Sequence, residues 1–312
     1  MSSIIKLKPV FKERIWGGTR LRDYFGYDIP SENTGECWAI SALSSGDCEI
    51  EDGEFKGKTL SWLYKNHREL FGGIENPEFP LLVKLIDAAD NLSIQVHPDD
   101  KYAREVEKQQ FGKTEAWYII EADEDTVLEI GHNANSKEEL HDMIENKKFQ
   151  KLLNYKPIKA GDFFYIPSGT VHAICKDTLI YEIQQSSDIT YRLYDYDRLD
   201  KKTDKPRELH TSKSIDVITV PQKIDTTAIP TVEADEGHQK IVYIENEYFS
   251  TYKYDVKDKV KLLNESFLLC TVMEGSGSIG DKEIKKGDNF IVPAECKDML
   301  VVGNISIMIS TM

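Results

Sequence analysis

The sequence predicts a mainly β protein built from two jelly-roll barrels, with a few helices inserted in its N-terminal part. The pattern Gly-Asp-x-Phe-x-hydrophobic-Pro occurs at residues 161–167 and again at residues 287–293. In each copy it is typical of a tight turn that leads into a short buried strand and stops at proline. Short segments rich in β-branched and aromatic residues fill much of the chain, which favours a sandwich or a barrel. The repeat indicates that one β-unit is built twice.

Nine segments have the composition of strands and are bounded by turn residues. We expect these strands at residues 36–43, 80–87, 92–96, 115–121, 163–166, 178–184, 240–254, 267–273 and 304–309.

Helices interrupt this series in the N-terminal part. Residues 59–70 and 99–111 have helical composition. A third helix, at residues 140–149, is opened by Ser136-Lys137-Glu138-Glu139. This Ser-x-x-Glu sequence is a capping box, in which two side chains satisfy backbone amides at the start of a helix.

The length of the chain suits roughly two domains. Residues 195–206 are charged and rich in turn residues, and residues 221–237 are polar and punctuated by proline. We place the linker in the second stretch. The prediction is therefore an N-terminal domain at residues 1–220, which carries the helical insertions, and a C-terminal jelly roll at residues 238–312.

Charge and composition exclude several classes of partner. The net charge of −15 argues against nucleic acid and against an anionic membrane surface. The sequence has no run of about 18 apolar residues and no apolar signal segment at its start, which predicts a cytoplasmic protein. The five cysteines are scattered and form no C-x-x-C pair, so we expect core residues and neither a disulfide framework nor a thiolate zinc site.

Four residues combine into a candidate metal site. Strand alternation sends Gln95 and His97 to one face, and Pro98 ends that strand. Glu115 opens the next apolar strand, and His172 follows the first copy of the repeated turn. Each of these residues alone also suits an ordinary polar role. Together they offer two imidazoles, a carboxylate and an amide, a donor set for zinc or another first-row divalent ion and, without thiolate, of catalytic character.

The remaining histidines lie in polar or helical surroundings, and we expect them at the surface. They are His67, His132, His141, His210 and His238. No histidine follows the second copy of the repeat, so the predicted metal site belongs to the first domain alone.

The chain resembles the type I phosphomannose isomerases along nearly its whole length, in the short bacterial form. The segments that carry the resemblance occur in the order of the family. They are Arg14-Ile15-Trp16-Gly17-Gly18, Gly35-Glu36-Cys37-Trp38-Ala39-Ile40-Ser41, Gln95-Val96-His97-Pro98, Gly112-Lys113-Thr114-Glu115-Ala116-Trp117 and Pro167-Ser168-Gly169-Thr170-Val171-His172-Ala173.

The resemblance implies two cupin barrels and one zinc ion per chain. The implied activity interconverts mannose 6-phosphate and fructose 6-phosphate through an enediolate. The ligands of the family fall on Gln95, His97, Glu115 and His172. The resemblance also implies roles for cationic residues: Arg192 and Lys113 in catalysis, and Arg192, Arg198 and Lys113 at the substrate phosphate.

Arg198 departs from the longer family members, which tend to carry lysine there, and arginine stays protonated. The residues alone leave the proton carrier open among Lys113, Glu182, a free histidine and a metal-bound water. Arg192 and Arg198 also suit salt bridges within their own acidic segment.

Two other functions remain open. One is an iron-dependent cupin oxygenase, and the other is a non-catalytic cupin that binds a sugar phosphate. The expected partner is a sugar phosphate substrate, with no nucleic acid and no membrane. The protein is expected to be a monomer or a weak homo-oligomer.

Overall fold

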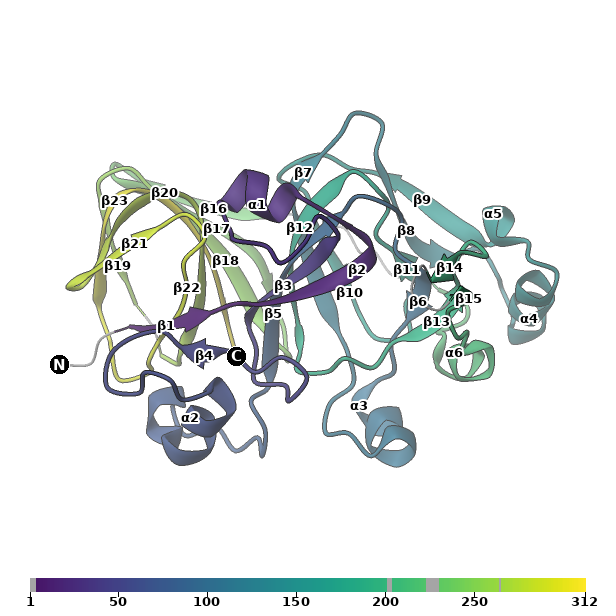
Figure 1. Cartoon of the computed structure of the whole chain (residues 1–312), viewed down its shortest axis with the longest axis horizontal. Coiled ribbons are helices and arrows are strands. Elements are labelled where there is room, and N and C mark those ends of the chain that lie inside the picture. The colour runs from purple at the N-terminus through teal and green to yellow at the C-terminus, as the bar shows by residue number, and fades with distance from the viewer. Residues whose placement is uncertain (1–3, 201–203, 223–229, 264) are drawn as a thin grey trace.

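The computed structural model describes residues 4–200, 204–222, 230–263 and 265–312. Strands predominate and helices are few, which confirms the mainly β prediction. Figure 1 shows two bodies of β-structure side by side along the long axis of the molecule. The later strands of the chain build one body, and strands from its first two thirds build the other. None of the described helices has the length and apolar character needed to cross a membrane.

A six-stranded antiparallel sheet occupies the middle of the molecule, with the strand order β10-β7-β12-β5-β3-β2. Its strands are β2 (Val10–Gly18), β3 (Thr34–Ile40), β5 (Leu81–Ala88), β7 (Glu115–Ala122), β10 (Phe163–Ile166) and β12 (Thr178–Gln185).

A five-stranded sheet packs against one face of this middle sheet, with the order β13-β6-β11-β8-β9. One buried cluster contains Ile119 and Ile180 from the middle sheet together with Ile130 from the five-stranded sheet, so the two sheets share a core. The strands are β6 (Ile94–Val96), β8 (Val127–His132), β9 (Leu153–Pro157), β11 (His172–Ala173) and β13 (Tyr191–Tyr194).

The C-terminal strands build a ten-stranded sheet, which covers the other face of the middle sheet. Tyr181 of β12 and Met308 of the C-terminal sheet belong to the same buried cluster, and the Tyr181 hydroxyl lies 3.0 Å from Oγ of Ser310. The strands are β1 (Ile5–Lys8), β4 (Glu49–Ile50), β16 (Thr231–Asp235), β17 (His238–Glu245), β18 (Ser250–Val256), β19 (Lys259–Leu262), β20 (Leu268–Ile279), β21 (Lys282–Lys285), β22 (Asn289–Val292) and β23 (Met299–Thr311).

The first strand of the chain belongs to this C-terminal sheet. β1 pairs with β22 through Ile5 opposite Ile291, and β4 pairs with β1 in turn. A small hairpin of β14 (Leu199–Asp200) and β15 (Lys205–Pro206) forms the fourth sheet. Among the described residues, no sheet closes on itself through strand pairing. The structure therefore confirms the predicted β-sheets but does not show the two closed barrels that we expected.

Short helices lie at the edges of the sheets (Figure 1). They are α1 (Arg20–Phe25), α2 (Leu60–Asn66), η1 (Arg68–Phe71), α3 (Asp100–Tyr102), η2 (Ala103–Glu107), α4 (Lys137–Glu145), α5 (Phe149–Leu152) and α6 (Thr211–Val217). The predicted helical stretches at 59–70, 99–111 and 140–149 all contain helix, whereas α1 and α6 were not predicted.

The predicted capping box at α4 forms with one change. Oγ of Ser136 accepts a hydrogen bond from the amide of Glu139 at 3.2 Å, as expected. The carboxylate of Glu139 accepts from the amide of Asn135 at 2.8 Å and not from Ser136 itself. The reciprocal bond therefore lies one residue earlier than the motif predicts.

Two strand predictions need correction. The predicted strand at residues 240–254 is two strands, because the side chain of Asn246 accepts from the amides of Tyr248 and Phe249 and turns the chain between β17 and β18. Part of the predicted linker is the strand β16, which pairs with β17. Residues 223–229 of that linker lie outside the described residues.

Burial confirms one prediction about side chains and overturns another. All five cysteines are buried and free, as expected of core residues. The prediction that His132 lies at the surface is wrong, because its ring is buried at the end of β8. Nε2 of His132 lies 2.9 Å from the carbonyl oxygen of Thr219, so this ring joins β8 to the segment after α6.

The repeated sequence forms the same turn twice. Gly161 and Gly287 have φ angles of 94° and 89°. In each copy an aspartate side chain accepts from the amide three residues earlier, at 3.0 Å for Asp162 and 3.1 Å for Asp288. The turns join β10 to β7 and β22 to β20 through matching backbone bonds. The duplication inferred from sequence is therefore present in the backbone.

The two turns predict a graded effect of adding one methyl group. Both Gly161→Ala and Gly287→Ala place a side chain at positive φ, which costs about 1–2 kcal/mol of stability. A Cβ at Gly161 meets nothing within 4 Å, whereas at Gly287 it would lie 3.2 Å from the ring of Tyr27. Chemical denaturation should show a larger loss for Gly287→Ala. An equal or smaller loss there would contradict the packing described.

Candidate functional site

Three strands of the five-stranded sheet bring predicted site residues into one row. Gln95 on β6 lies opposite His172 on β11 and, on its other side, opposite Arg192 on β13. The amide nitrogen of Gln95 donates to Nε2 of His172 at 3.3 Å. A half-turn of this amide would bring its carbonyl oxygen to the same place.

Glu115 reaches this row from β7 of the middle sheet and lies between two histidines. Its Oε1 is 3.3 Å from Nε2 of His172, and its Oε2 is 3.6 Å from Nε2 of His97. The ligand-type atoms of the three residues lie within 4.8 Å of one another, and all three side chains are buried. Within the described ranges, no other three His, Cys, Asp or Glu side chains come together in this way.

Backbone carbonyls fix both imidazole rings in the same tautomer. Nδ1 of His97 lies 2.8 Å from the carbonyl oxygen of Ile189, and Nδ1 of His172 lies 2.9 Å from that of Thr170. A carbonyl oxygen only accepts, so each Nδ1 carries the hydrogen. Each Nε2 then presents its lone pair toward Glu115, which is how a histidine binds a metal.

Burial controls the charges in this cluster. Burial and the neighbouring Lys113 ammonium lower the pKa of His172 to about 3, and they lower the pKa of His97 well below its usual value. Both rings are therefore neutral at pH 7. Burial also raises the pKa of Glu115, although the Lys113 ammonium opposes this change. The ammonium lies 2.6 Å from Oε2 of Glu115 and 3.1 Å from Nε2 of His97.

The cluster fits a metal ion. It already surrounds the Lys113 cation, yet neither oxygen of Glu115 accepts a hydrogen bond of ordinary geometry. A buried carboxylate of this kind is costly unless positive charge compensates it. Two imidazole nitrogens, a carboxylate and an adjacent amide suit a first-row divalent ion, and a set without thiolate is typical of catalytic centres.

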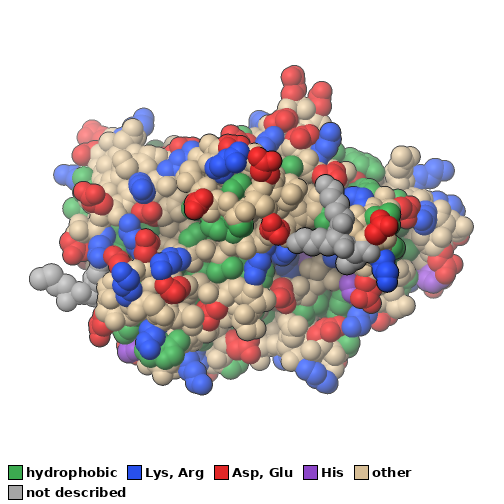
Figure 2. Space-filling model, in the orientation of Figure 1, with side chains coloured by type: hydrophobic (Ala, Val, Ile, Leu, Met, Phe, Trp, Pro, Cys, Tyr) green, Lys and Arg blue, Asp and Glu red, His purple; other side chains and the backbone are tan. Residues whose placement is uncertain are grey.

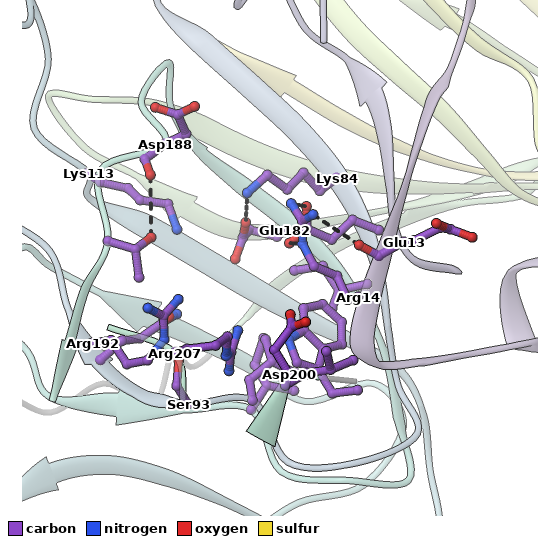
Figure 3. A pocket seen from close by; sticks show the side chains of 18 residues that line it. Glu13, Arg14, Lys84, Ser93, Lys113, Glu182, Asp188, Arg192, Asp200 and Arg207 are labelled. Atoms are coloured by element: carbon purple, nitrogen blue, oxygen red, sulfur yellow. Dashed lines mark hydrogen bonds and ion pairs between the residues drawn. The ribbon is translucent and has the colours of Figure 1, made fainter. Parts of the chain in front are cut away.

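A cavity of about 480 Å³ adjoins the cluster. Gln95, which contacts His172, and Lys113, which contacts Glu115, both line it. In Figure 3 the side chains of Lys113, Glu182, Arg192 and Arg207 lie around a common space, whereas the carboxylates of Glu13 and Asp188 point away from it. Charges of both signs line it: Glu13, Arg14, Glu36, Lys84, Lys113, Glu182, Asp188, Arg192, Asp200 and Arg207. Basic groups are thus as frequent as acidic ones here, in a chain of net charge −15. On the face shown in Figure 2, acidic and basic side chains are interspersed.

Lys84 and Glu182 form a buried ion pair on the cavity wall. They lie opposite each other on β5 and β12, with Nζ 3.2 Å from Oε1. Trp117 on β7 donates from Nε1 to Oε2 of Glu182 at 3.0 Å. Burial disfavours the charged form of Glu182, but Lys113 and Lys84 outweigh it and hold its pKa below the usual value. Lys84 had no predicted role. The available signal was a charge in the middle of a strand that is apolar apart from Lys84 and Asp87.

Of the three arginines between residues 192 and 207, two line the cavity, and they are not the two that the sequence suggested. Arg192 lines the cavity, as expected. Arg198 does not line it, because its guanidinium donates to the carbonyl of Asn91 and to Asp195, both at 2.6 Å. Arg207 lines the cavity instead, and no sequence motif pointed to it. The structure therefore brings Gln95, His97, Glu115, His172, Lys113 and Arg192 together and leaves Arg198 outside the lining of the cavity.

In a mainly β protein, a buried cluster of two histidines and a glutamate beside a charged cavity defines a candidate metal centre. Residues 4–156 match the type I phosphomannose isomerase catalytic domain, and residues 239–312 match the mannose-6-phosphate isomerase cupin domain. The chain belongs to the type I phosphomannose isomerase family.

Relatives of similar length support this membership. Putative mannose-6-phosphate isomerase YvyI of Bacillus subtilis is 50% identical, over 99% of this chain and 98% of its own. Mannose-6-phosphate isomerase ManA of the same organism is 50% identical over 92% and 91%. The crystal structure of a mannose 6-phosphate isomerase from Bacillus subtilis covers 100% of both chains with 49% identity and a TM-score of 0.96.

The buried ion pair predicts a test of the cavity wall. Lys84→Met leaves the Glu182 carboxylate without its partner, and we expect a loss of about 3–5 kcal/mol in unfolding free energy, the usual cost of an unpaired buried charge. The double change Lys84→Met with Glu182→Gln removes both charges and should recover much of this loss. Denaturation curves compare the two variants. A double variant as unstable as the single one would show that the pair does not govern stability here.

Proposed function

We propose that this protein is an aldose–ketose isomerase that interconverts mannose 6-phosphate and fructose 6-phosphate. The observation that carries the proposal is the buried cluster of His97, Glu115 and His172 beside a cavity with an arginine on its wall. Family membership and the names of the relatives support the same substrate.

The proposed metal is one zinc ion per chain, held by Gln95, His97, Glu115 and His172. The neutral imidazoles, the carboxylate without hydrogen bonds and the absence of thiolate support this set. A metal bound there supplies a Lewis acid that stabilises negative charge on a substrate oxygen.

The reaction moves a carbonyl between C1 and C2, which requires removal of a proton from the neighbouring carbon and passes through an enediolate. Arg192 lies beside Gln95 and provides a fixed positive charge for the negative charge that develops, a preorganised contribution that lowers the barrier. Lys113 neutralises Glu115 at the same end of the cavity.

We assign the proton transfer to the Lys84 and Glu182 pair. Both residues line the cavity. The Glu182 carboxylate would accept the proton from one substrate carbon and return it to the neighbouring carbon, while the Lys84 ammonium, 3.2 Å away, stabilises the carboxylate between these steps. No histidine lines this cavity among the described residues, which removes a free histidine from the candidates that the sequence left open.

The phosphate of the substrate requires cations that face the cavity. Arg192 meets this requirement, and the expectation for Lys113 shifts to the reacting end, because its ammonium is bound to Glu115 and His97. Arg198 is not among the residues that line the cavity, and its guanidinium is bound to Asn91 and Asp195, so we assign the phosphate to other cations.

We also propose that the sheets correspond to two cupin barrels, one for catalysis within residues 1–220 and one at residues 238–312. The pairing of β1 with β22 means that the first strand of the chain would belong to the second barrel. A cytoplasmic enzyme that is a monomer or a weak homo-oligomer fits this proposal.

Metal removal tests the proposed centre. Treatment with a chelator should abolish isomerisation of mannose 6-phosphate, and zinc should restore it at one ion per chain. Zinc should also raise the melting temperature, because binding to the folded state alone stabilises it. Coupled assays, metal analysis and thermal denaturation measure these effects. Full activity in a verified metal-free sample would contradict the proposal, and oxygen uptake by iron-loaded protein would favour an oxygenase.

Arg192→Ala should lower turnover about 100-fold or more while the bound zinc stays at one per chain, because the arginine acts on developing charge and is not a ligand. Arg192→Lys retains a positive charge without the planar guanidinium, so its turnover should lie between those of the wild type and Arg192→Ala. Steady-state kinetics and metal analysis of the same samples make the comparison. Loss of zinc in parallel with activity would assign Arg192 a structural role.

A further inference from the structure

Arg207 is a second arginine on the wall of the cavity. It directly follows β15, in the hairpin that β14 and β15 form, and it lines the cavity together with Arg192. Figure 3 shows the two side chains close together on the same side of the cavity. Arg207 lies outside the sequence motifs that carry the family resemblance.

A buried carboxylate holds Arg207 by one edge of its guanidinium. Nε donates to Oδ2 of Asp195 at 2.7 Å, and Nη2 donates to Oδ1 at 2.5 Å. Asp195 is 4% exposed. Nη1 of Arg207 makes no hydrogen bond to any residue in the described ranges, so the other edge of the planar fork remains available to a ligand. Asp195 therefore fixes the direction in which Arg207 presents its free edge.

Three guanidinium groups, those of Arg192, Arg198 and Arg207, gather around the buried carboxylate of Asp195. Asp195 is the only carboxylate, among the described residues, that ion-pairs with both Arg207 and Arg198. Arg192 donates from Nη1 only to the carbonyl oxygen of Glu208, and its buried Nε has no partner. Arg198 has one further partner, an exposed aspartate. Clustered guanidinium groups repel one another, so an anion between Arg192 and Arg207 would be stabilised by both.

We propose that Arg207 binds the phosphate group of the substrate together with Arg192, and that Asp195 is the positioning residue that aims it. This inference rests on the proposed function, because it places a phosphorylated sugar in the cavity. Arg192 then spans the phosphate and the reacting carbons, whereas Arg207 acts on the phosphate alone.

The other arginine of the cavity is a poorer anion site. Arg14 donates from Nε and Nη2 to Glu36, at 3.2 and 2.9 Å, and from Nη1 to the carbonyl oxygen of Glu13. All three nitrogens are engaged, and a carboxylate of its own neutralises the charge. An anion gains less at Arg14 than at Arg207, which shares Asp195 with Arg198.

The Michaelis constant for mannose 6-phosphate tests Arg207 directly. Arg207→Ala should raise it about 10- to 100-fold, the range for lost charge-assisted hydrogen bonds, with kcat changed less than threefold. Arg207→Lys should raise it less, because a single ammonium replaces the fork. Arg22→Ala, which removes an exposed arginine on α1, is the matched control for net charge and should leave the constant unchanged. A constant unchanged in Arg207→Ala would overturn the inference.

Binding of inorganic phosphate separates this inference from the proposed function. Titration calorimetry should show that phosphate binds the wild-type, zinc-loaded protein and binds Arg207→Ala about tenfold or more weakly. If the wild type fails to isomerise mannose 6-phosphate but phosphate binding still depends on Arg207, the proposed reaction falls and the anion site stands. Equal phosphate affinity in both proteins overturns the anion site even if the wild type is active.

The positioning role of Asp195 has its own readout. Asp195→Asn keeps the shape but removes the charge that holds Arg207, so the Michaelis constant should rise with little change in kcat. Asp195→Glu should recover part of the affinity, since the carboxylate returns. The double variant Asp195→Asn with Arg207→Ala should be no worse than Arg207→Ala alone, because both changes remove one contact. Additive losses would show that Asp195 acts by another route.

Discussion

The buried negative charge of Glu115 is the constraint on which the rest of the site depends. A carboxylate with no exposed surface and no hydrogen bond of ordinary geometry is tolerated only where positive charge or a metal compensates it. Two neutral imidazoles and the Lys113 ammonium surround it. The backbone carbonyls that orient the two rings are thus part of the same requirement, because a rotated ring would present N–H hydrogen where a lone pair is needed.

The middle sheet determines which charged side chains face the cavity and which apolar side chains face the core. Alternation along β12 sends Tyr181 and Ile183 into the core shared with the C-terminal sheet, and it sends Glu182 toward the cavity. The same alternation along β5 places Lys84 opposite Glu182. A one-residue slip in either strand would bury a charge in the apolar core, so register is strongly specified. The C-terminal strands consequently contribute to function without touching the cavity, since they fix the face that the middle sheet presents.

The sequence predicts the parts of this site that depend on local pattern. Gln95 and His97 share a face because they are two residues apart along an extended segment. The start of α4 after Ser136 is predictable because the N-cap is a local motif. Contacts between strands that are distant in the sequence could not be predicted from local pattern. The pairing of Lys84 with Glu182 depends on the register of β5 and β12, which are distant in sequence. The position of Arg207 depends on the hairpin of β14 and β15, which brings it back to Asp195. Sequence analysis assigned the phosphate to Arg198 instead, which lies only six residues after Arg192.

The repeated turn explains why only one half of the molecule carries chemistry. Both copies form the same glycine and aspartate turn, so the fold requires the turn and not the residues that follow it. After the first copy the chain reaches His172, in a core that includes charged and polar groups. After the second it reaches Cys296, within a cluster that is otherwise aliphatic and aromatic. The buried polar side chains described in this body are hydroxyls and one amide, such as Thr271 and Asn289, which bond to each other, and they include no histidine or carboxylate that could hold a metal. The second body therefore serves as the rigid support on which the middle sheet, and with it Glu115, is held.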